Sequence, residues 1–393
     1  MLIALHPLAA FRADTAAAPD NTTEADAEWL TIATLIARAA DLPRAERENA
    51  LRTVAALGNV SVDMTEAADV AVALAVRTAI AMEDAARFHL AFATLASVLQ
   101  VLPENDVVGR GRVLAQQGRI ARQLGEHAEA KERYDAVEAL ADRVTGTAAA
   151  AELSARAWVG YGILAHIRGN LPEARNWFRR VLSTDGVPRE QQQVAHTQLM
   201  IAAAASKDFD GAAVHAWAAY ESADGDQKLG AMSNLAQVLL DAGHPKLALR
   251  GFGSILVQKP IPRREFAALS GAAVAAARGL PEGRARPLVE LFATRLQALI
   301  ATTQLPWSHA VALADVSDAY AALGAVLAAT QVRDQAIAVA DRYGFHELSY
   351  RLRESQAAPG LTRVTPLRKA ARVAEEVESF TTTDEVAEAL AGV

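Results

Sequence analysis

The chain of 393 residues contains no cysteine. This absence excludes disulfide bonds, thiolate nucleophiles and cysteine-bound zinc, and it fits the cytoplasmic location that we expect. Aromatic residues are also scarce, at 5% of the chain, although hydrophobic residues make up 52%. β-Sheets are usually rich in aromatic and β-branched residues. An apolar share carried largely by alanine, leucine and valine therefore favours closely packed helices.

Basic charge is in the minority. The chain has 39 lysines and arginines against 46 acidic residues, so its formal net charge is −7. Domains that bind nucleic acid are usually strongly basic, and we therefore expect no nucleic-acid partner. The chain also lacks the run of about eighteen apolar residues that a membrane-spanning helix needs, so we expect no membrane partner. The apolar start has no basic segment and is interrupted by His6 and Pro7, which argues against a signal peptide.

The clearest pattern lies in residues 155–182, ARAWVGYGILAHIRGNLPEARNWFRRVL. Its apolar residues recur at spacings of three and four on each side of a break at Gly169 and Asn170, which predicts two short amphipathic helices. Pro172 suits the first turn of the second helix, where a missing N–H costs nothing. The first apolar face consists of Trp158, Tyr161, Gly162 and Ala165, and the second of Ala174, Phe178, Val181 and Leu182.

This stretch resembles a tetratricopeptide repeat (TPR), whose signature W-x₂-L-G-x₂-Y…A-x₃-F…P extends over about 34 residues. Similar hairpins recur along the chain. The resemblance implies an all-α fold, a right-handed α-solenoid (superhelix) of about seven TPR-like helical hairpins. The matching residues are Trp158, Tyr161, Gly162, Ala165, Gly169, Ala174 and Phe178, and the seven units begin near Val72, Gly111, Ala155, Gln193, Leu229, Arg264 and Ala310.

The spacing between units runs from 35 to 46 residues, which is longer than in the TPR family. Extra residues near 145–151 and 281–306 predict lengthened helices at those points. The unit at Arg264 is the least regular, because Pro287 stands where the aromatic residue of the second helix is expected.

We divide the chain into four parts. Residues 1–26 are expected to form a flexible leader, and residues 27–60 an N-terminal helical hairpin. Residues 61–356 are expected to form the TPR-like solenoid, and residues 357–393 a charged helical tail, in which Thr382 begins a capping-box pattern. The sequence leaves open whether this tail folds back onto the hairpins.

No pattern typical of an active site stands out. The nine histidines are scattered, and no two of them have the spacing of a helical zinc site. The stretch from Gly109 to Arg112 resembles a phosphate-binding loop but lacks the Lys-Ser/Thr ending, although a helix N-terminus there could hold an anion. We therefore expect no enzyme, no catalytic residue, no metal site and no cofactor.

Binding is the function that the resemblance favours. In TPR proteins, fixed positions of the first helix of each repeat line a concave groove that binds peptides. Arginines at such positions suit the carboxylates of an acidic peptide, because guanidinium pairs with carboxylate through two hydrogen bonds. The alternative is that Glu126, Glu129 and Glu132 of the following helix neutralise these arginines. The candidate binding residues are Arg112, Arg119, Arg122, Arg156, Val159, Ile163, His166, Asn234 and Gln237.

The leading hypothesis is thus a non-catalytic TPR-like scaffold or adaptor that binds a peptide or protein partner in its groove. If the arginines contact that partner, it is acidic. The alternative is a sensory or regulatory module of bacterial signalling or transcription control that responds to a peptide or small ligand. This alternative arises because residues 340–348, ADRYGFHEL, resemble the C-terminal helical repeats of such regulators. The sequence leaves open whether the chain forms a homo-oligomer.

Overall fold

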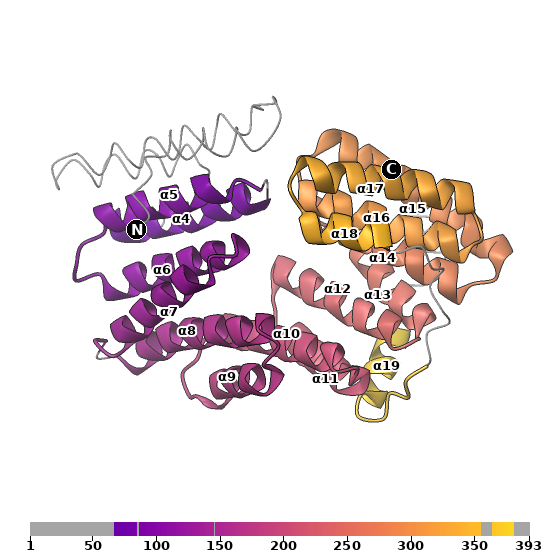
Figure 1. The fold of residues 1–393 in the computed structure, drawn as a ribbon. Coiled ribbons are helices and arrows are strands. Elements are labelled where there is room, and N and C mark those ends of the chain that lie inside the picture. Colours follow the sequence, from indigo (N-terminus) through magenta and orange to yellow (C-terminus); the bar gives the residue numbers. More distant parts are fainter. Residues whose placement is uncertain (1–66, 85, 145, 355–363, 381–393) are drawn as a thin grey trace. The chain divides into compact units, whose positions relative to one another are not determined.

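The structure is a computed structural model that describes residues 67–84, 86–144, 146–354 and 364–380. Within these ranges it contains sixteen α-helices and no strand (Figure 1). The expected leader, the hairpin expected at 27–60 and the capping box at Thr382 lie outside the described residues. None of the helices in the described ranges combines the length and the apolar character that crossing a bilayer requires.

The chain divides into two compact units between Gln191 and Gln192. Unit 1 holds α4 (Ala67–Asp84), α5 (Phe88–Val101), α6 (Val107–Gln123), α7 (His127–Ala141), α8 (Thr147–Ile167) and α9 (Leu171–Ser183). Unit 2 holds most of α10 (Arg189–Ala205) and then α11 (Phe209–Ser222), α12 (Gly225–Asp241), α13 (Pro245–Val257), α14 (Pro262–Gly279), α15 (Glu282–Thr302), α16 (Pro306–Ala322), α17 (Val326–Arg342), α18 (His346–Glu354) and α19 (Ala371–Glu378).

Helices pair in sequence order into hairpins, and the hairpins stack within each unit. In unit 1 the first helix of each hairpin contacts the first helix of the next, as α4 does with α6 and α6 with α8. In unit 2 the helices α12, α14 and α16 repeat this arrangement. The predicted all-α fold of about seven repeated helical hairpins is confirmed by this pattern, in which each repeat packs on its neighbours.

Six of the seven predicted hairpins turn at a residue in the left-handed conformation two positions after the first helix. Gly169 has a φ of 78°, and the N–H of Asn170 donates to the carbonyl of Ala165 at 2.9 Å, which closes the end of α8. Asn170 then begins α9, since its side chain accepts the N–H of Glu173 at 3.4 Å. Lys207 takes the same conformation without glycine, at a φ of 59°. The six hinge residues are Ala86, Gly125, Gly169, Lys207, Gly243 and Gly324.

Glycines let the aromatic residues of second helices pass between first helices. A Cβ atom at Gly118 would lie 2.7 Å from the Tyr134 ring, and one at Gly160 would lie 2.5 Å from the same ring. The Tyr134 ring is therefore held between α6 and α8. Phe178 lies against Gly162 in the same way, since a Cβ atom added at Gly162 would be 2.4 Å from the Phe178 ring. These residues determine the close approach of the helices in unit 1.

The two predicted lengthened helices are confirmed. α8 and α15 each contain 21 residues, more than any other helix in the described ranges. The unit at Arg264 forms a regular hairpin of α14 and α15, with Pro287 inside α15. Phe292, one and a half turns after Pro287, is fully buried and supplies an aromatic residue to the core of this hairpin.

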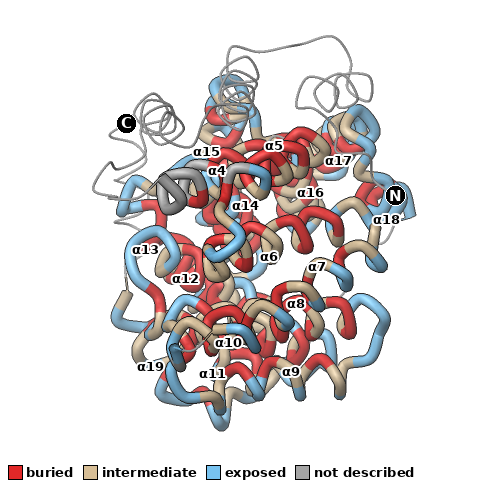
Figure 2. Tube along the Cα trace, turned by 90° about the vertical axis from the view of Figure 1, so that its left-hand side faces the viewer, coloured by how far each residue is buried: buried red, intermediate tan, exposed pale blue. Residues whose placement is uncertain are grey.

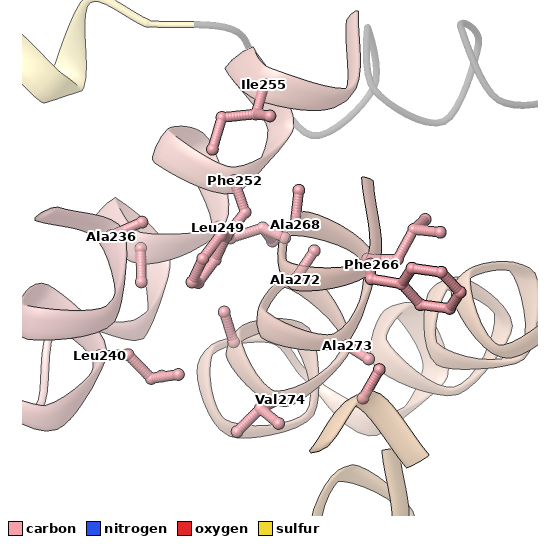
Figure 3. Packing of buried hydrophobic residues seen from close by; sticks show 14 of the residues in the cluster. Ala236, Leu240, Leu249, Phe252, Ile255, Phe266, Ala268, Ala272, Ala273 and Val274 are labelled. Carbon is pink, nitrogen blue, oxygen red and sulfur yellow. The ribbon is translucent and has the colours of Figure 1, made fainter. Parts of the chain in front are cut away.

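A continuous hydrophobic cluster extends through most of unit 2. It includes Leu249 and Phe252 of α13, Phe266 of α14 and alanines of α14, which Figure 3 shows close together. Buried residues recur along the helices, while exposed residues gather at the turns (Figure 2). Small side chains on α14 allow its neighbours α12, α13 and α16 to approach it closely.

The described part of the C-terminal tail, residues 364–380, folds back onto unit 2. The N–H of Thr365 donates to the carbonyl of Ala242 at 2.8 Å. The carboxylate of Asp210 accepts the N–H groups of Lys369 and Ala370 at 3.0 Å. α19 lies beside α11 and α13 (Figure 1), and its apolar face is buried there. We call residues 364–380 the C-terminal strap.

Candidate binding site

Seven of the nine candidate binding residues lie in unit 1, on α6 and α8. These are the first helices of adjacent hairpins, and we call the side that carries these residues the first-helix face of unit 1. Asn234 and Gln237 lie on α12 in unit 2 and are described separately. The residues on the first-helix face are Arg112, Arg119, Arg122, Arg156, Val159, Ile163 and His166.

Two of the four arginines share one carboxylate. Arg112 donates to both oxygens of Glu152, each at 2.8 Å, which is a bidentate pair. Arg156 donates to the same Glu152 from one helical turn away, at 3.0 Å, and also lies 3.9 Å from Glu190. The hydrogen bond from Arg112, with further contributions from Arg156, holds the pKa of Glu152 below its ordinary value. The carboxylate is therefore ionised and compensates much of the charge of both arginines.

A third arginine is paired across α4 and α6. The Nε of Arg119 lies 3.1 Å from a carboxylate oxygen of Glu83, whose side chain is 3% exposed. Gln116 donates to the other oxygen of Glu83. The alternative that Glu126, Glu129 and Glu132 neutralise the arginines is wrong for these contacts, because the carboxylates belong to the first helices α4 and α8. Glu129 pairs with Arg133 on its own helix instead.

Arg122 differs from the other three arginines. No carboxylate in the described part of the chain forms an ion pair with it, and its buried Nε has no hydrogen-bond partner there. Its guanidinium faces the hydroxyl of Tyr134, which reaches the first-helix face between α6 and α8. Burial raises the pKa of the Tyr134 hydroxyl, while the hydrogen bond and charge of Arg122 oppose the rise. A neutral phenol leaves the charge of Arg122 uncompensated.

His166 occupies the position equivalent to Arg122 in the next hairpin. Each of the two stands three residues before its hinge glycine, Gly125 or Gly169. The buried Nδ1 of His166 also has no hydrogen-bond partner among the described residues. The same position holds only alanine or leucine in three hairpins of unit 2, namely Ala204, Leu240 and Ala321. Among the hairpins with a left-handed hinge residue, polar side chains at this position therefore belong to unit 1.

The two apolar candidates on α8 differ in exposure. Val159 is 8% exposed and belongs to the buried core beneath the first-helix face. Ile163 is half-buried, and Ile167 one turn later is 45% exposed. An apolar strip on α8 therefore runs beside Arg156 and His166.

The candidates of unit 2 form no charged cluster with the arginines. Asn234 is half-buried on α12, and the exposed Gln237 donates to Asp241 at 3.0 Å. Burial raises the pKa of Asp241, against the effects of Gln237 and Arg278.

Two other expectations concern ions. The N–H of Gly109 donates to Asp106 at 2.9 Å, so the start of α6 is capped by the chain's own carboxylate and not by a bound anion. Within the described ranges, no three His, Asp or Glu side chains are gathered as metal ligands.

Sequence reasoning missed three residues that organise this face. Glu83 and Glu152 come from first helices that are distant in sequence, and Tyr134 was seen only as a packing aromatic. One signal was available for Glu83, because it stands three residues before the hinge residue Ala86, as Arg122 does before Gly125. If the repeats had been aligned on their hinge residues, Glu83, Arg122 and His166 would have fallen at the same repeat position.

Comparisons with known proteins give a structural likeness and no sequence family. No protein-family model matches the chain, and no curated protein matches it. Among solved structures, the crystal structure of a Rap protein complexed with Competence and Sporulation Factor is similar. The similarity covers 78% of this chain and 87% of that chain, with a TM-score of 0.48 and 14% sequence identity.

Proposed function

We propose that this chain is a divergent TPR array that acts as a scaffold, and that the first-helix face of unit 1 binds an acidic segment of a peptide or protein partner. The observation that carries this proposal is the pair of buried nitrogens, Arg122 Nε and His166 Nδ1, that lack hydrogen-bond partners on adjacent hairpins. A buried polar group without a partner costs about 1–3 kcal/mol. A ligand acceptor that meets either nitrogen recovers part of that cost.

A carboxylate is the acceptor that suits this pair best. The charge of Arg122 is not compensated by a described carboxylate, and guanidinium forms its strongest hydrogen bonds with carboxylates. Arg122 Nε and His166 Nδ1 have no hydrogen-bond partner to lose, so either atom can bind a ligand without breaking an existing bond. The half-buried Ile163 and the exposed Ile167 offer apolar contact beside the polar pair.

The distance between Arg122 and His166 determines how far apart the acceptor groups of a peptide ligand should be. Adjacent packed helices have axes about 8–10 Å apart. A peptide in the extended polyproline II conformation rises about 3.1 Å per residue with three residues per turn, so side chains three residues apart lie on the same side. Two acceptors three residues apart in an extended peptide would therefore reach Arg122 and His166 together. One of the two could be the terminal carboxylate.

The paired arginines play a different part in this proposal. Arg112, Arg119 and Arg156 hold Glu83 and Glu152, so contact with a ligand would compete with bonds that already exist. They keep α4, α6 and α8 in register. We therefore expect them to support the face, with Arg122 and His166 making the specific contacts.

The test selects ligands without assuming a partner. A displayed library of random peptides is selected on the full chain, and the enriched peptides are synthesised and measured by fluorescence anisotropy. We expect enrichment of two acidic positions about three residues apart. We expect R122Q to weaken binding about tenfold or more, because hydrogen bonds to charged groups contribute about 1.5–3 kcal/mol.

The control is R179Q, since Arg179 is an exposed arginine on the second helix α9. It removes one positive charge from the same unit, and binding should be unchanged. A selection that enriches no acidic pattern would contradict the proposal, and so would equal binding by R122Q and R179Q.

The regulatory alternative uses the same face. It differs in requiring that the bound peptide change another part of the chain. Hydrogen exchange with and without a selected peptide separates the two functions. Protection confined to α4, α6 and α8 favours the scaffold, and a changed pattern in α12 to α18 favours the regulator.

A further inference from the structure

Two histidines from different helices face each other in unit 2. His196 lies on α10 and His215 on α11, and their Nδ1 atoms are 3.4 Å apart. The two ring centroids are 5.6 Å apart, so the Nδ1 atoms are the parts of the rings that meet. In the sequence these residues are 19 positions apart and form no recognisable ligand pattern.

The distance between the two nitrogens is informative. Hydrogen bonds from N–H groups have a usual length of about 2.9–3.0 Å, so 3.4 Å is long for such a bond. Nitrogen ligands lie about 2.0–2.1 Å from Zn²⁺, and two of them on a tetrahedral ion are therefore about 3.3–3.4 Å apart. Neighbouring nitrogens of a square-planar ion would be closer, at about 2.8–3.0 Å. The observed separation fits a tetrahedral ion.

The equivalent positions of the preceding hairpin contain a cation. Trp158 and Trp177 stand eleven residues before and eight residues after the hinge residue Gly169, as His196 and His215 do around Lys207. Between the two tryptophans lies the guanidinium of Arg180, 4.0 Å from the ring centre of Trp158 and 5.6 Å from that of Trp177. The exposed Arg180 therefore places a positive charge against both indole rings.

The α10–α11 hairpin lacks that positive charge. The residue equivalent to Arg180, eleven positions after the hinge residue, is Ala218. Two imidazoles thus replace two indoles in the hairpin that lacks the equivalent of Arg180. An imidazole binds a metal ion through a ring nitrogen, whereas an indole offers only an N–H donor.

We propose that His196 and His215 bind a tetrahedral transition-metal ion, Zn²⁺ being the best fit, through their Nδ1 atoms. Within the described ranges no third His, Asp or Glu side chain joins them, so water or a ligand fills the remaining positions. Zinc that exchanges ligands keeps at least one coordination position open, whereas structural zinc is held by four protein ligands. A site with two protein ligands therefore belongs with the open sites. This site is separate from the first-helix face of unit 1 and does not depend on the function proposed for it.

The surroundings support the neutral form of the ligand. Burial lowers the pKa of His196, and the neighbouring His215 acts in the same direction. Neutral imidazole is the form that coordinates a metal. An ion held from both helices would join α10 to α11, and by mass action it would stabilise the folded state over the unfolded one.

The test uses the full chain after treatment with a chelator. Zn²⁺ is titrated by calorimetry, and the melting temperature is measured with and without Zn²⁺. We expect one ion per chain and a rise in melting temperature. Co²⁺ is then added in place of Zn²⁺, and we expect the intense visible absorption of tetrahedral Co²⁺ in place of the weak bands of the octahedral ion.

Three variants assign the site. H196N and H215N should each weaken Zn²⁺ binding by at least about tenfold, because each removes one of two protein ligands. H127N changes an exposed histidine of α7 and should bind as the unchanged chain does. Circular dichroism shows whether the variants fold, and a folded H196N or H215N variant with unchanged binding overturns the proposal. Absence of stoichiometric binding to the unchanged chain also overturns it.

Discussion

At the scale of single residues, Asp315 of α16 is held in an unfavourable setting for an ionised carboxylate. Burial raises its pKa to about 6, and the neighbouring Asp318 adds to the rise. Ser270 donates to it at 2.8 Å, and Arg278 and Arg351 act in the opposite direction without cancelling the effect of burial. Because the folded pKa exceeds the ordinary value of 3.8, protonation favours the folded state.

This setting predicts a stabilising substitution. D315N keeps an oxygen acceptor for Ser270 and removes the ionised charge, so at pH 8 it should stabilise the chain by about 1–3 kcal/mol. The unchanged chain should gain this stability as the pH falls from about 6 towards 3.8, so the difference between the two should shrink over that range. Urea unfolding of both chains at several pH values measures this difference in the free energy of unfolding.

Asp341 provides a control of opposite sign. The hydrogen bond from Ser349, together with Arg353, lowers the pKa of Asp341. D341N should therefore destabilise the chain at neutral pH, and its effect should fade as the pH falls through the lowered pKa. A destabilised D315N at pH 8 would contradict this account of α16.

Two glycines predict opposite effects of one extra methyl group. G160A would place a Cβ atom 2.5 Å from the Tyr134 ring between α6 and α8, and it should destabilise the chain by about 1–3 kcal/mol. G283A lies in the first turn of α15, where a Cβ atom meets nothing within 4 Å. It should be neutral or stabilise by up to about 1 kcal/mol. Thermal unfolding of the two variants measures the difference.

At the scale of helices, the C-terminal strap depends on one carboxylate. Asp210 accepts the N–H groups of Lys369 and Ala370 at the start of α19, while Arg250 donates to the carbonyl of Glu378 at its end. These groups would otherwise lack partners at the ends of a short helix. The strap is therefore held at both ends by residues of unit 2.

Removal of that carboxylate should release the strap. D210A should cost about 0.5–2 kcal/mol, as the loss of a helix cap usually does, and should speed proteolysis between residues 364 and 380. D224A is the matched control, since Asp224 precedes α12 without a side-chain cap bond. Equal cleavage of the strap in both variants would show that Asp210 does not hold it.

The hairpins could be predicted from the sequence because their causes are local. Apolar spacing, hinge glycines and caps such as Asn170 act over a few residues, and all seven hairpins lie where these patterns placed them. The carboxylate partners of the arginines could not be predicted, because Glu152 meets Arg112 from 40 positions away and its register depends on packing. The docking of the strap and the meeting of His196 with His215 depend on packing in the same way.

At the scale of the whole molecule, the two units have separate cores. In repeat proteins each hairpin contacts only its neighbours, so a local loss of stability spreads over a short distance. G160A should therefore reduce hydrogen-exchange protection in α6 to α9 and leave α14 to α17 near their original protection. Equal loss in both units would show that the chain unfolds as one cooperative body.

The central claim is that Arg122 and His166 meet a ligand carboxylate on the first-helix face of unit 1. A double-mutant cycle tests it most directly, with R122Q in the chain and a Glu or Asp changed to its amide in a selected peptide. We predict that the two changes together cost less than the sum of each alone, by about 1 kcal/mol or more. Additive costs would show that Arg122 and the acidic residue do not interact, and the account of this face would be wrong.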